Sequence, residues 1–446
     1  MSRFVSVVKR NGSVVPFTQD RITNAIYRAA VAVGGRDKQA SRELSDQVVT
    51  LLEQAIPDDQ NPTIEQIQDM VEKVLIENGH ARVAKAYILY RDERARQREK
   101  RKENMYQLST NIPWEKLWHV LDWAAGHEVH TVAQLNAHIR NGTLPQIVTA
   151  AEAAYHEDVE NAASMVLSRR DEVRMVFIAG PSSSGKTTTT IKLGEYLSRA
   201  DLKLVTLNVD NYFFDLEMHP KDEFGDYDFE TPQALDLQLI NEHLSRLFAG
   251  EEVRIPYYDF KTGHRQNDQI PMKLDTNDII LIDSLHGLYP DMTSSIPANM
   301  KFKLYIEPLL QLKDEQGHYV RWTDIRLIRR MLRDAAHRAY DPTQTLLHWH
   351  YVRTSELRHI IPYINTTDTI VNSAMPYEFP MYKARLGEAF ARWKIELADD
   401  PLRQDAFERA SRVHALMEQL ESVPDDSIVP ENSVIREFIG GGIYKY

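Results

Sequence analysis

One octapeptide constrains this chain more than any other feature. Residues 180–187 read Gly-Pro-Ser-Ser-Ser-Gly-Lys-Thr, which satisfies the phosphate-binding pattern G-x-x-x-x-G-K-[ST]. The apolar run at 175–179 leads directly into it, and a helix is expected to follow Lys186. A strand, a glycine-rich loop and a helix N-terminus in this order surround a phosphate with backbone N–H groups and a partial positive charge. We therefore expect the chain to bind a nucleotide.

The residue types in this loop predict how ATP and Mg²⁺ are held. We expect Lys186 to bridge the β- and γ-phosphates and Thr187 to hold the metal. A second metal ligand is expected from Asp283, which ends an apolar strand in the Walker-B manner, although it is alternatively a plain strand-ending acid. The residues of the loop and the following turn that we expect to bind ATP are Gly180, Ser182, Ser183, Ser184, Gly185, Lys186, Thr187 and Thr188.

The sequence around the loop alternates between strand and helix patterns. Further strands are expected at 202–209, 278–282 and 301–306, each an apolar run bounded by turn signals. This pattern predicts an α/β fold over residues 173–395, in which a parallel sheet has helices on both faces, as in P-loop NTPases.

Three other regions flank this domain. Residues 1–100 open with two short strands joined by an Asn-Gly turn and continue as amphipathic helices, one of which begins with a capping box at Thr63. Residues 101–172 are expected to form a helical linker region, with Trp114, Trp118 and Trp123 on a buried face. Residues 396–446 are expected to form a helix and an extended tail with a flexible glycine-rich end.

Two features near the loop indicate what receives the phosphoryl group. Asp210 ends the strand after the phosphate-loop helix, where a carboxylate can accept a proton from a substrate hydroxyl; a cap or turn role is the alternative. Four arginines share one face of a later helix, which favours a lid over the transferring phosphates. A solvated or salt-bridged face is the alternative. These arginines are Arg326, Arg329, Arg330 and Arg333.

Composition excludes several classes of function. The net charge is −12, so nucleic acid is not expected as a partner. The chain has no cysteine, which excludes disulfides and thiolate chemistry and fits a reducing compartment. Since the chain lacks a membrane-spanning apolar run and its first residues lack a secretory signal, we expect a cytoplasmic protein without membrane contact.

Five motifs in order resemble the uridine kinase and phosphoribulokinase family of P-loop kinases. They are IAGPSSSGKTT, NVDNYF, YDFETPQALD, RIPYYDFKTGHR and DIRLIRRMLRD, all between residues 172 and 395. The resemblance implies that Asp210 is the catalytic base and that the arginine helix is the lid, with Arg326 and Arg330 acting on the reacting phosphates and Arg329 and Arg333 on ATP. It also implies an acceptor site that contains Tyr212, Glu230, Tyr258 and Arg265.

The sequence departs from this family at the acceptor site. Pyrimidine nucleoside kinases carry a histidine five residues after the tyrosine, and here that position is Gly263. We therefore expect a Mg-ATP-dependent kinase of a nucleoside such as uridine or cytidine. The alternatives are a kinase of a phosphosugar, glycerate or pantothenate-like acceptor, and a catalytically idle nucleotide-sensing regulator.

Residues 3–100 resemble the ATP-cone, a regulatory nucleotide-binding module. The resemblance rests on the start of the chain and on the run VAKAYILYR at 83–91. A β-hairpin with cations and backbone N–H groups at its turn can grip a triphosphate. We therefore expect ATP or dATP to bind here and to regulate the kinase, which we expect to be a homo-oligomer. The residues implied are Val7, Lys9, Arg10, Asn11, Gly12 and Arg21.

Overall fold

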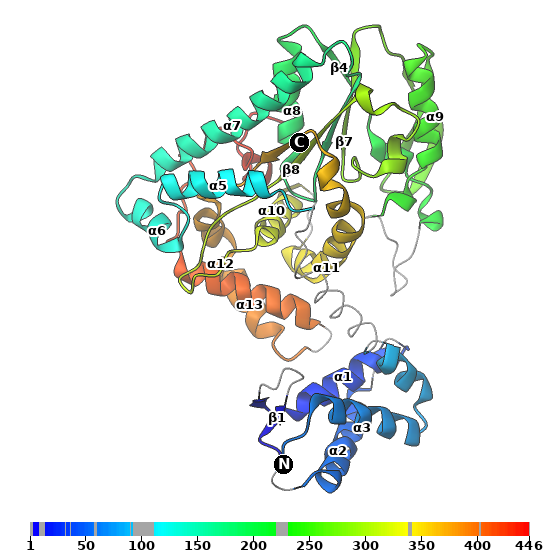
Figure 1. Ribbon diagram of the computed structural model, residues 1–446, viewed down its shortest axis with the longest axis vertical. Helices are drawn as coiled ribbons and strands as arrows, with labels where there is room; N and C mark the ends of the chain where they lie inside the picture. Colours follow the sequence, from blue (N-terminus) through cyan, green and yellow to red (C-terminus); the bar gives the residue numbers. More distant parts are fainter. Residues whose placement is uncertain are drawn as a thin grey trace. The chain divides into compact units, whose positions relative to one another are not determined.

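Separate hydrophobic cores divide the chain into two units, residues 1–109 with 400–402 and residues 110–399 with 403–446. The computed structural model (Figure 1) describes residues 3–8, 14–31, 33–35, 37–57, 60–89, 91, 111–219, 231–337, 341–400 and 403–445. Each unit is described by itself.

The first unit combines a hairpin with a helical core. Strand β1 (Ser6–Val8) pairs antiparallel with β2 (Val14–Pro16), which confirms the predicted strands. The turn between them lies outside the described residues. Its helices include α1 (Gln19–Val31), α2 (Lys38–Ala55) and α3 (Ile64–Glu77), and residues 81–89 are helical as well.

The start of α3 confirms the local helix signal. The Thr63 hydroxyl accepts from the backbone N–H of Gln66, and the Gln66 side chain accepts from the backbone N–H of Thr63. This reciprocal capping box satisfies two N–H groups that a helix start leaves without partners. From there the helix buries Val71, Val74 and Leu75 in the core of the first unit.

A five-stranded sheet forms the centre of the second unit, and all of its neighbouring strands are parallel. Its order places the strand that precedes the phosphate loop in the middle, which confirms the predicted parallel sheet. The strands, from edge to edge, are β4 (Lys203–Thr206), β7 (Asp278–Ser284), β3 (Met175–Ala179), β8 (Lys301–Glu307) and β9 (Thr369–Asn372).

Alternate residues of β3 enter different hydrophobic clusters. Val176 and Ile178 pack with α7 (Leu144–Ser168) and α8 (Lys186–Ser198), and Met175 and Phe177 pack with α9 (Leu237–Phe248). Because successive side chains of a strand point to opposite faces, helices cover both faces of the sheet, as predicted. The fold is the α/β arrangement expected of a P-loop protein.

Helices and a separate hairpin complete the second unit. The short 3-10 helix η1 (Val209–Tyr212) follows β4, and β5 (Val253–Asp259) pairs antiparallel with β6 (His264–Met272) outside the main sheet. The remaining 3-10 helices are η2 (Leu216–Met218), η3 (Pro232–Ala234), η4 (Pro290–Thr293), η5 (Ala298–Met300) and η6 (Ile361–Thr366). The other α-helices are α5 (Trp114–Gly126), α6 (Val132–Arg140), α10 (Trp322–His337), α11 (Pro342–His359), α12 (Glu378–Glu396), α13 (Gln404–Gln419) and α14 (Arg436–Ile439).

Two expectations about packing are wrong. Trp114 and Trp118 are 54% and 65% exposed, so of the tryptophan stripe of α5 only Trp123 packs against the core. The C-terminal tail is packed and not extended, since Val434, Ile435 and Phe438 are buried. Periodicity identifies residues on one helix face but not whether another element covers that face.

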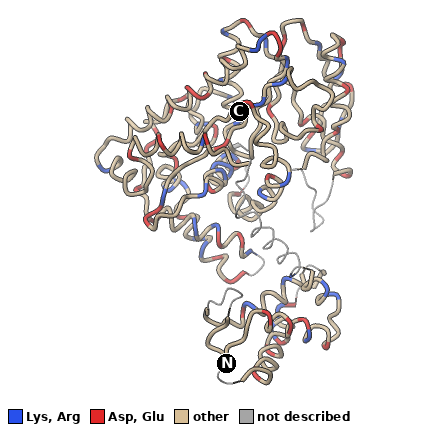
Figure 2. The backbone as a smooth tube through the Cα atoms, viewed as in Figure 1, with Lys and Arg blue, Asp and Glu red and all other residues tan. Residues whose placement is uncertain are grey.

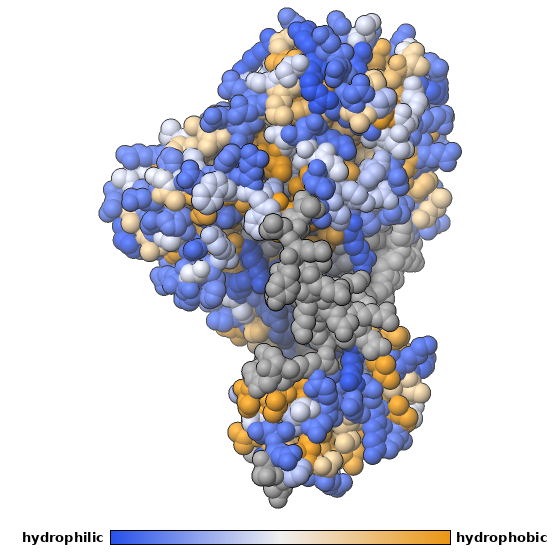
Figure 3. Space-filling model, viewed as in Figure 1, coloured by the Kyte–Doolittle hydropathy of each residue, from blue (hydrophilic) through white to orange (hydrophobic). Residues whose placement is uncertain are grey.

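The surfaces of both units carry a mixture of charged, polar and apolar residues. Basic and acidic residues are interspersed along the backbone of both units (Figure 2), and the visible face of the second unit is largely hydrophilic (Figure 3). Apolar patches are visible on the first unit (Figure 3). Exposed apolar side chains of this unit include Val5, Val14, Ile76 and Leu89. Among the described residues, no helix combines the length and apolarity that crossing a bilayer requires.

Candidate functional site

The phosphate loop needs glycine at both of its ends. A Cβ atom at Gly180 would lie 2.3 Å from the carbonyl oxygen of Ile306, so only glycine fits beside β8. Gly185 caps α8 with a φ of 93°, and a Cβ there would lie 2.6 Å from Cγ2 of Val434. Between them, Ser183 adopts a positive φ of 58°. This curvature turns the loop around the N-terminus of α8.

Lys186 folds back over the loop as its predicted role requires. Its Nζ donates to the carbonyl oxygens of Gly180 at 3.0 Å and Pro181 at 3.2 Å. The ammonium group therefore lies on the concave side of the loop, beside the helix N-terminus. Two positive features at one place favour a bound polyanion.

A partly buried carboxylate interacts electrostatically with this lysine. Asp283 pairs with Ile178 across β7 and β3, one residue before the phosphate loop strand ends. Burial raises its pKa to about 6, the charge of Lys186 opposes this shift, and the carboxylates of Glu437 and Asp210 add to it. A bound cation would stabilise the charged form of this carboxylate against the charges of Glu437 and Asp210.

The donors present fit a magnesium ion. The Asp283 carboxylate and the hydroxyl of Thr187, the second residue of α8, are hard oxygen ligands of the kind Mg²⁺ prefers. No cluster of three or more histidine or acidic side chains arranged for a metal occurs in the part of the chain described. In proteins Mg²⁺ is usually bound by one or two protein oxygens together with water and phosphate.

Asp210 lies at the same end of the sheet as Asp283, where the carboxyl ends of the parallel strands meet. It belongs to η1, which follows β4, the strand that pairs with β7. Asn208 performs the capping role there, because its Oδ1 accepts from the backbone N–H of Asp210 at 3.0 Å. Asn208 is therefore the cap of η1, and Asp210 is an exposed residue within it.

The structure brings three of the four predicted acceptor residues close to one another, because Tyr258 and Arg265 are opposite each other on β5 and β6 and the Tyr258 backbone bonds to Asn211 of η1. The assignment of Tyr212 to the acceptor site is wrong, because its side chain is fully buried and its hydroxyl bonds to Nδ1 of His243 at 3.0 Å. Tyr258 is also buried, and its hydroxyl has no partner among the described residues. Arg265 forms an ion pair with Asp236 at 3.0 Å. Glu230 lies outside the described residues.

The lid assignment is wrong for two of the four arginines. Arg326 and Arg329 are fully buried in ion pairs, with Glu356 at 2.5 Å and Glu378 at 2.6 Å. Carboxylates from other elements, and not a bound polyanion, neutralise this helix face, which is the salt-bridged alternative. Arg326 and Arg329 instead support the loop from behind, through the carbonyl groups of Ser182 at 3.2 Å and Ser184 at 3.4 Å.

The other two arginines lie at the front of the loop. Arg330 donates to the hydroxyl of Ser182 at 2.7 Å and to Asp334 at 2.7 Å. Arg333 lies 3.9 Å from both Asp334 and Glu437. Their side chains are 23% and 20% exposed, so they retain access to a ligand that the buried pair lacks.

Sequence reasoning missed His286. This histidine is 4% exposed, follows the Asp283 strand end, and has no hydrogen-bond partner on either ring nitrogen among the described residues. Burial, His359 and Lys186 lower its pKa to about 3, so the imidazole is neutral. A neutral ring with two unused nitrogens near Lys186 can bond to a substrate. Its place in the IDSLHGLYP run was the only signal available.

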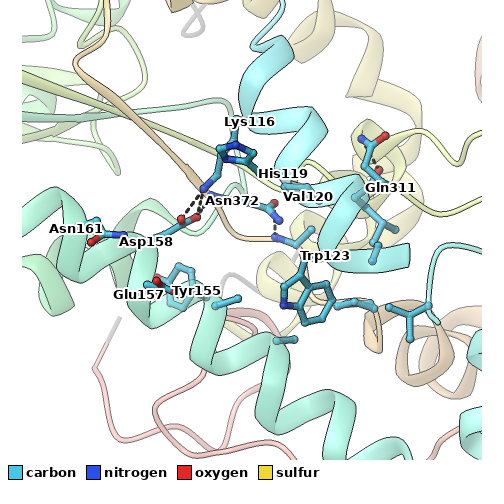
Figure 4. A pocket seen from close by; sticks show the side chains of 17 residues that line it. Lys116, His119, Val120, Trp123, Tyr155, Glu157, Asp158, Asn161, Gln311 and Asn372 are labelled. Atoms are coloured by element: carbon cyan, nitrogen blue, oxygen red, sulfur yellow. Dashed lines mark hydrogen bonds and ion pairs between the residues drawn. The ribbon is translucent and has the colours of Figure 1, made fainter. Parts of the chain in front are cut away.

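A cavity of about 300 Å³ lies apart from the loop, between α5, α7 and the ends of β8 and β9. Figure 4 shows the ion pair of Lys116 and Asp158, which are 2.5 Å apart, and the Trp123 ring on another wall. The cavity touches the loop helix indirectly, because the Tyr155 hydroxyl bonds to the Thr189 hydroxyl at 2.7 Å.

The proposed regulatory residues are only partly described. Val7 is a buried residue in the middle of β1, and Arg21 is exposed in the first turn of α1. The buried position of Val7 leaves only its backbone to contact a nucleotide. The other four predicted residues, Lys9, Arg10, Asn11 and Gly12, lie outside the described residues.

Comparison with known proteins confirms both resemblances. Residues 175–378 match the Phosphoribulokinase / Uridine kinase family, and residues 5–96 match the ATP cone domain. The Uridine kinase of Deinococcus deserti is 27% identical over 198 residues, which are 44% of this chain and 86% of that enzyme. The Uridine kinase of Brevibacillus brevis is 26% identical over 198 residues, 44% of this chain and 83% of its own.

A third relative matches a smaller part of the chain. The Vitamin B12-dependent ribonucleoside-diphosphate reductase of Thermoplasma acidophilum is 42% identical over 100 residues. These residues are 21% of this chain and 12% of the reductase, so the similarity is that of one domain.

Proposed function

Because residues 175–378 belong to the Phosphoribulokinase / Uridine kinase family, we propose that the second unit transfers the γ-phosphoryl group of ATP to a hydroxyl group of a nucleoside such as uridine or cytidine. The family and its uridine kinase relatives make the chain an ATP-dependent kinase of a hydroxyl group. What we propose beyond this reaction is that the acceptor is a nucleoside.

One observation supports this chemistry most directly. Asp210 follows β4 and Asp283 lies near the carboxyl end of the neighbouring strand β7, and the two interact electrostatically at the end of the sheet where Lys186 covers the phosphate loop. In our proposal Asp210 accepts the proton of the acceptor hydroxyl while the oxygen of that hydroxyl forms a bond to the γ-phosphorus. The bond from that phosphorus to the β–γ bridging oxygen breaks, and ADP leaves with the electron pair. Lys186 and Arg330 stabilise the charge on the phosphates. When bound by Thr187 and Asp283, Mg²⁺ supplies further positive charge.

The test measures ADP release from ATP with uridine, cytidine, a phosphosugar, glycerate and pantothenate as acceptors. We expect a pyrimidine nucleoside to give the highest kcat/KM. Asp210→Asn is expected to lower kcat roughly 10²- to 10⁴-fold with ATP affinity unchanged. Asp171→Asn, an exposed acid before β3, is the matched control. Full activity of Asp210→Asn would remove this carboxylate from the mechanism.

A specific observation favours a non-nucleoside acceptor as the second candidate. Gly263 has a φ of 72°, and a Cβ there would lie 2.9 Å from Cβ of Leu216. A histidine that reads a pyrimidine base cannot occupy this position without a shift of η2. His264, the next residue, has a side chain 63% exposed and lies 3.7 Å from Asp215. Preference for an acid or phosphosugar in the acceptor test would select this candidate.

We also propose that the first unit binds ATP or dATP and regulates the kinase. The ATP cone match over residues 5–96 supports a nucleotide ligand there. Bound nucleotide would alter kinase activity by changing the oligomeric state or by changing the position of Arg330 and Arg333 over the phosphates. A chain that binds nucleotide but releases no ADP with any acceptor would instead be a nucleotide-sensing regulator.

A further inference from the structure

A carboxylate from the far end of the chain caps the phosphate-loop helix. Thr188 is the third residue of α8, and its backbone N–H donates to Oε2 of Glu437 at 3.2 Å. The hydroxyl of the same threonine donates to the same oxygen at 2.9 Å. The two residues are 249 positions apart, and Glu437, which belongs to α14, is 2% exposed.

The position that this carboxylate takes is one that a nucleotide uses. The first N–H groups of a helix have no intrahelical acceptor, and in α8 the Thr189 N–H is bonded to the Gly185 carbonyl at 3.1 Å. The N–H groups before it are those that hold the α- and β-phosphates in a loop of this type. Glu437 therefore supplies a negative charge where the structure would otherwise receive a phosphate oxygen.

Two further contacts place Glu437 within the phosphate site. Its Oε1 lies 3.9 Å from Nη1 of Arg333, one of the arginines at the front of the loop. Its charge also helps to raise the pKa of Asp283, the proposed metal ligand. Glu437 thus interacts with an N–H donor, a cation and an acid that would all surround a bound triphosphate.

The segment that delivers Glu437 is firmly packed. Val434 lies against Gly185, and the Phe438 ring lies 4.9 Å from the Arg329 guanidinium carbon. Ser433 and Ile435 are fully buried, and the Ser433 hydroxyl donates to Glu152. Because α14 is part of the core, its backbone is held beside the loop and presents the Glu437 side chain to Thr188, which is not a chance surface contact.

We propose that Glu437 competes with the donor nucleotide for the phosphate loop and so sets the affinity of this kinase for ATP. This inference rests on the proposed function, because it takes ATP to be the ligand of the loop. When the phosphates arrive, the carboxylate gives up Thr188 and turns away from the loop. The apparent affinity is then reduced by the fraction of molecules in which Glu437 blocks the site.

The variant Glu437→Gln tests the competition. It keeps the size of the side chain and removes the charge, so the Kd for ATP, measured by calorimetry on the full chain, is expected to fall about tenfold. Glu431→Gln is the matched control, since it removes the same charge from an exposed position of the same segment and is expected to leave the Kd unchanged. An unchanged or higher Kd for Glu437→Gln would overturn the proposal.

A measurement on the unaltered protein covers the case in which the variant fails to fold. Hydrogen exchange of the backbone amides at 433–440 is followed with and without ATP. Competition predicts faster exchange when ATP is bound, because the nucleotide removes the Thr188 contact. Equal or slower exchange would show that Glu437 and ATP bind together, which contradicts the proposal.

These outcomes separate the inference from the proposed function. ADP release with a hydroxyl acceptor, combined with ATP affinity insensitive to Glu437, overturns the competition and leaves the kinase assignment. Absence of ADP release with every acceptor overturns the kinase assignment, while a tenfold gain in ATP affinity for Glu437→Gln would still support the competition.

Discussion

Arg329 and Glu378 form an ion pair in which neither side chain is exposed, with two hydrogen bonds of 2.7 and 2.6 Å. Arg329 also donates to the carbonyl groups of Ser184 at 3.4 Å and Ser373 at 2.7 Å. One arginine thus joins α10 and α12 to the back of the phosphate loop. Its charge serves the shape of the loop, because a carboxylate inside the protein already neutralises it.

We predict that Arg329→Met lowers the free energy of unfolding of the second unit by about 3–5 kcal/mol, since it leaves the Glu378 charge buried without a partner. The double variant Arg329→Met/Glu378→Gln is expected to recover part of this loss. Urea unfolding of the full chain measures both. Arg392→Met is the control on α12, where the side chain is 60% exposed and its ion pair with Glu396 spans 3.7 Å. Equal stability of Arg329→Met and Arg392→Met would show that the buried pair is dispensable.

Asp283→Asn tests the proposed metal site. Loss of the carboxylate is expected to lower kcat about 100-fold or more and to raise the Mg²⁺ concentration needed for half-maximal activity. The control is Asp275→Asn. The Asp275 side chain is 80% exposed and precedes β7, at the end of the sheet opposite to Asp283. An unchanged magnesium dependence in Asp283→Asn would place the metal elsewhere.

Lys192 on α8 predicts a pH dependence of stability. Burial lowers its pKa to about 8, against the opposing charges of Glu152 and Glu195, and its Nζ contacts His156. Between pH 8 and the usual lysine value near 10.5, the unfolded chain binds a proton that the folded chain does not. Stability due to this group therefore rises with pH across that window, by up to about 3 kcal/mol.

The measurement compares the unaltered protein with Lys192→Met at pH 8 and pH 10. The unaltered protein is expected to gain stability relative to this variant as the pH rises. Lys394→Met, at an exposed position of α12, is expected to show a constant difference. A constant difference for Lys192→Met as well would mean that the buried amine keeps its proton.

The ATP cone assignment predicts two nucleotide sites in each chain. Titration with a non-hydrolysable ATP analogue should show two binding events, one weakened by Lys186→Ala and the other by Arg21→Ala. Loss of one charge-assisted hydrogen bond at the exposed Arg21 is expected to weaken the second event about tenfold. Lys38→Ala, at another exposed position of the first unit, is the control. A single binding event would leave the first unit without a nucleotide role.

Local features of the fold could be predicted because their physics lies within a few residues. The capping box at Thr63 and the glycine requirement at Gly185 each follow from neighbours in the sequence and from backbone geometry. The central strand of the sheet was also predictable, since a continuous run of apolar residues next to a turn signal is typical of a strand that is covered on both faces.

The arginine helix shows where such reasoning ends. Periodicity placed Arg326, Arg329, Arg330 and Arg333 on one face, but it carried no information about what lies opposite. The carboxylates of Glu356 and Glu378, 30 and 49 residues further along, decide that the first two are structural. Tyr212 was misassigned for a related reason, because a motif resemblance does not determine which way a side chain points, and here the Tyr212 hydroxyl bonds to His243.

By itself, the amino-acid sequence determined the phosphate-binding pattern of this chain, in a loop between a buried strand and a helix, because that pattern consists of eight consecutive residues. Only the tertiary structure decided which charges surround the phosphate. Glu437 reaches Thr188 across 249 residues because packing of α14 against the loop brings them together. Electrostatic interactions depend on distance in space, and the order of residues along a chain does not encode that distance.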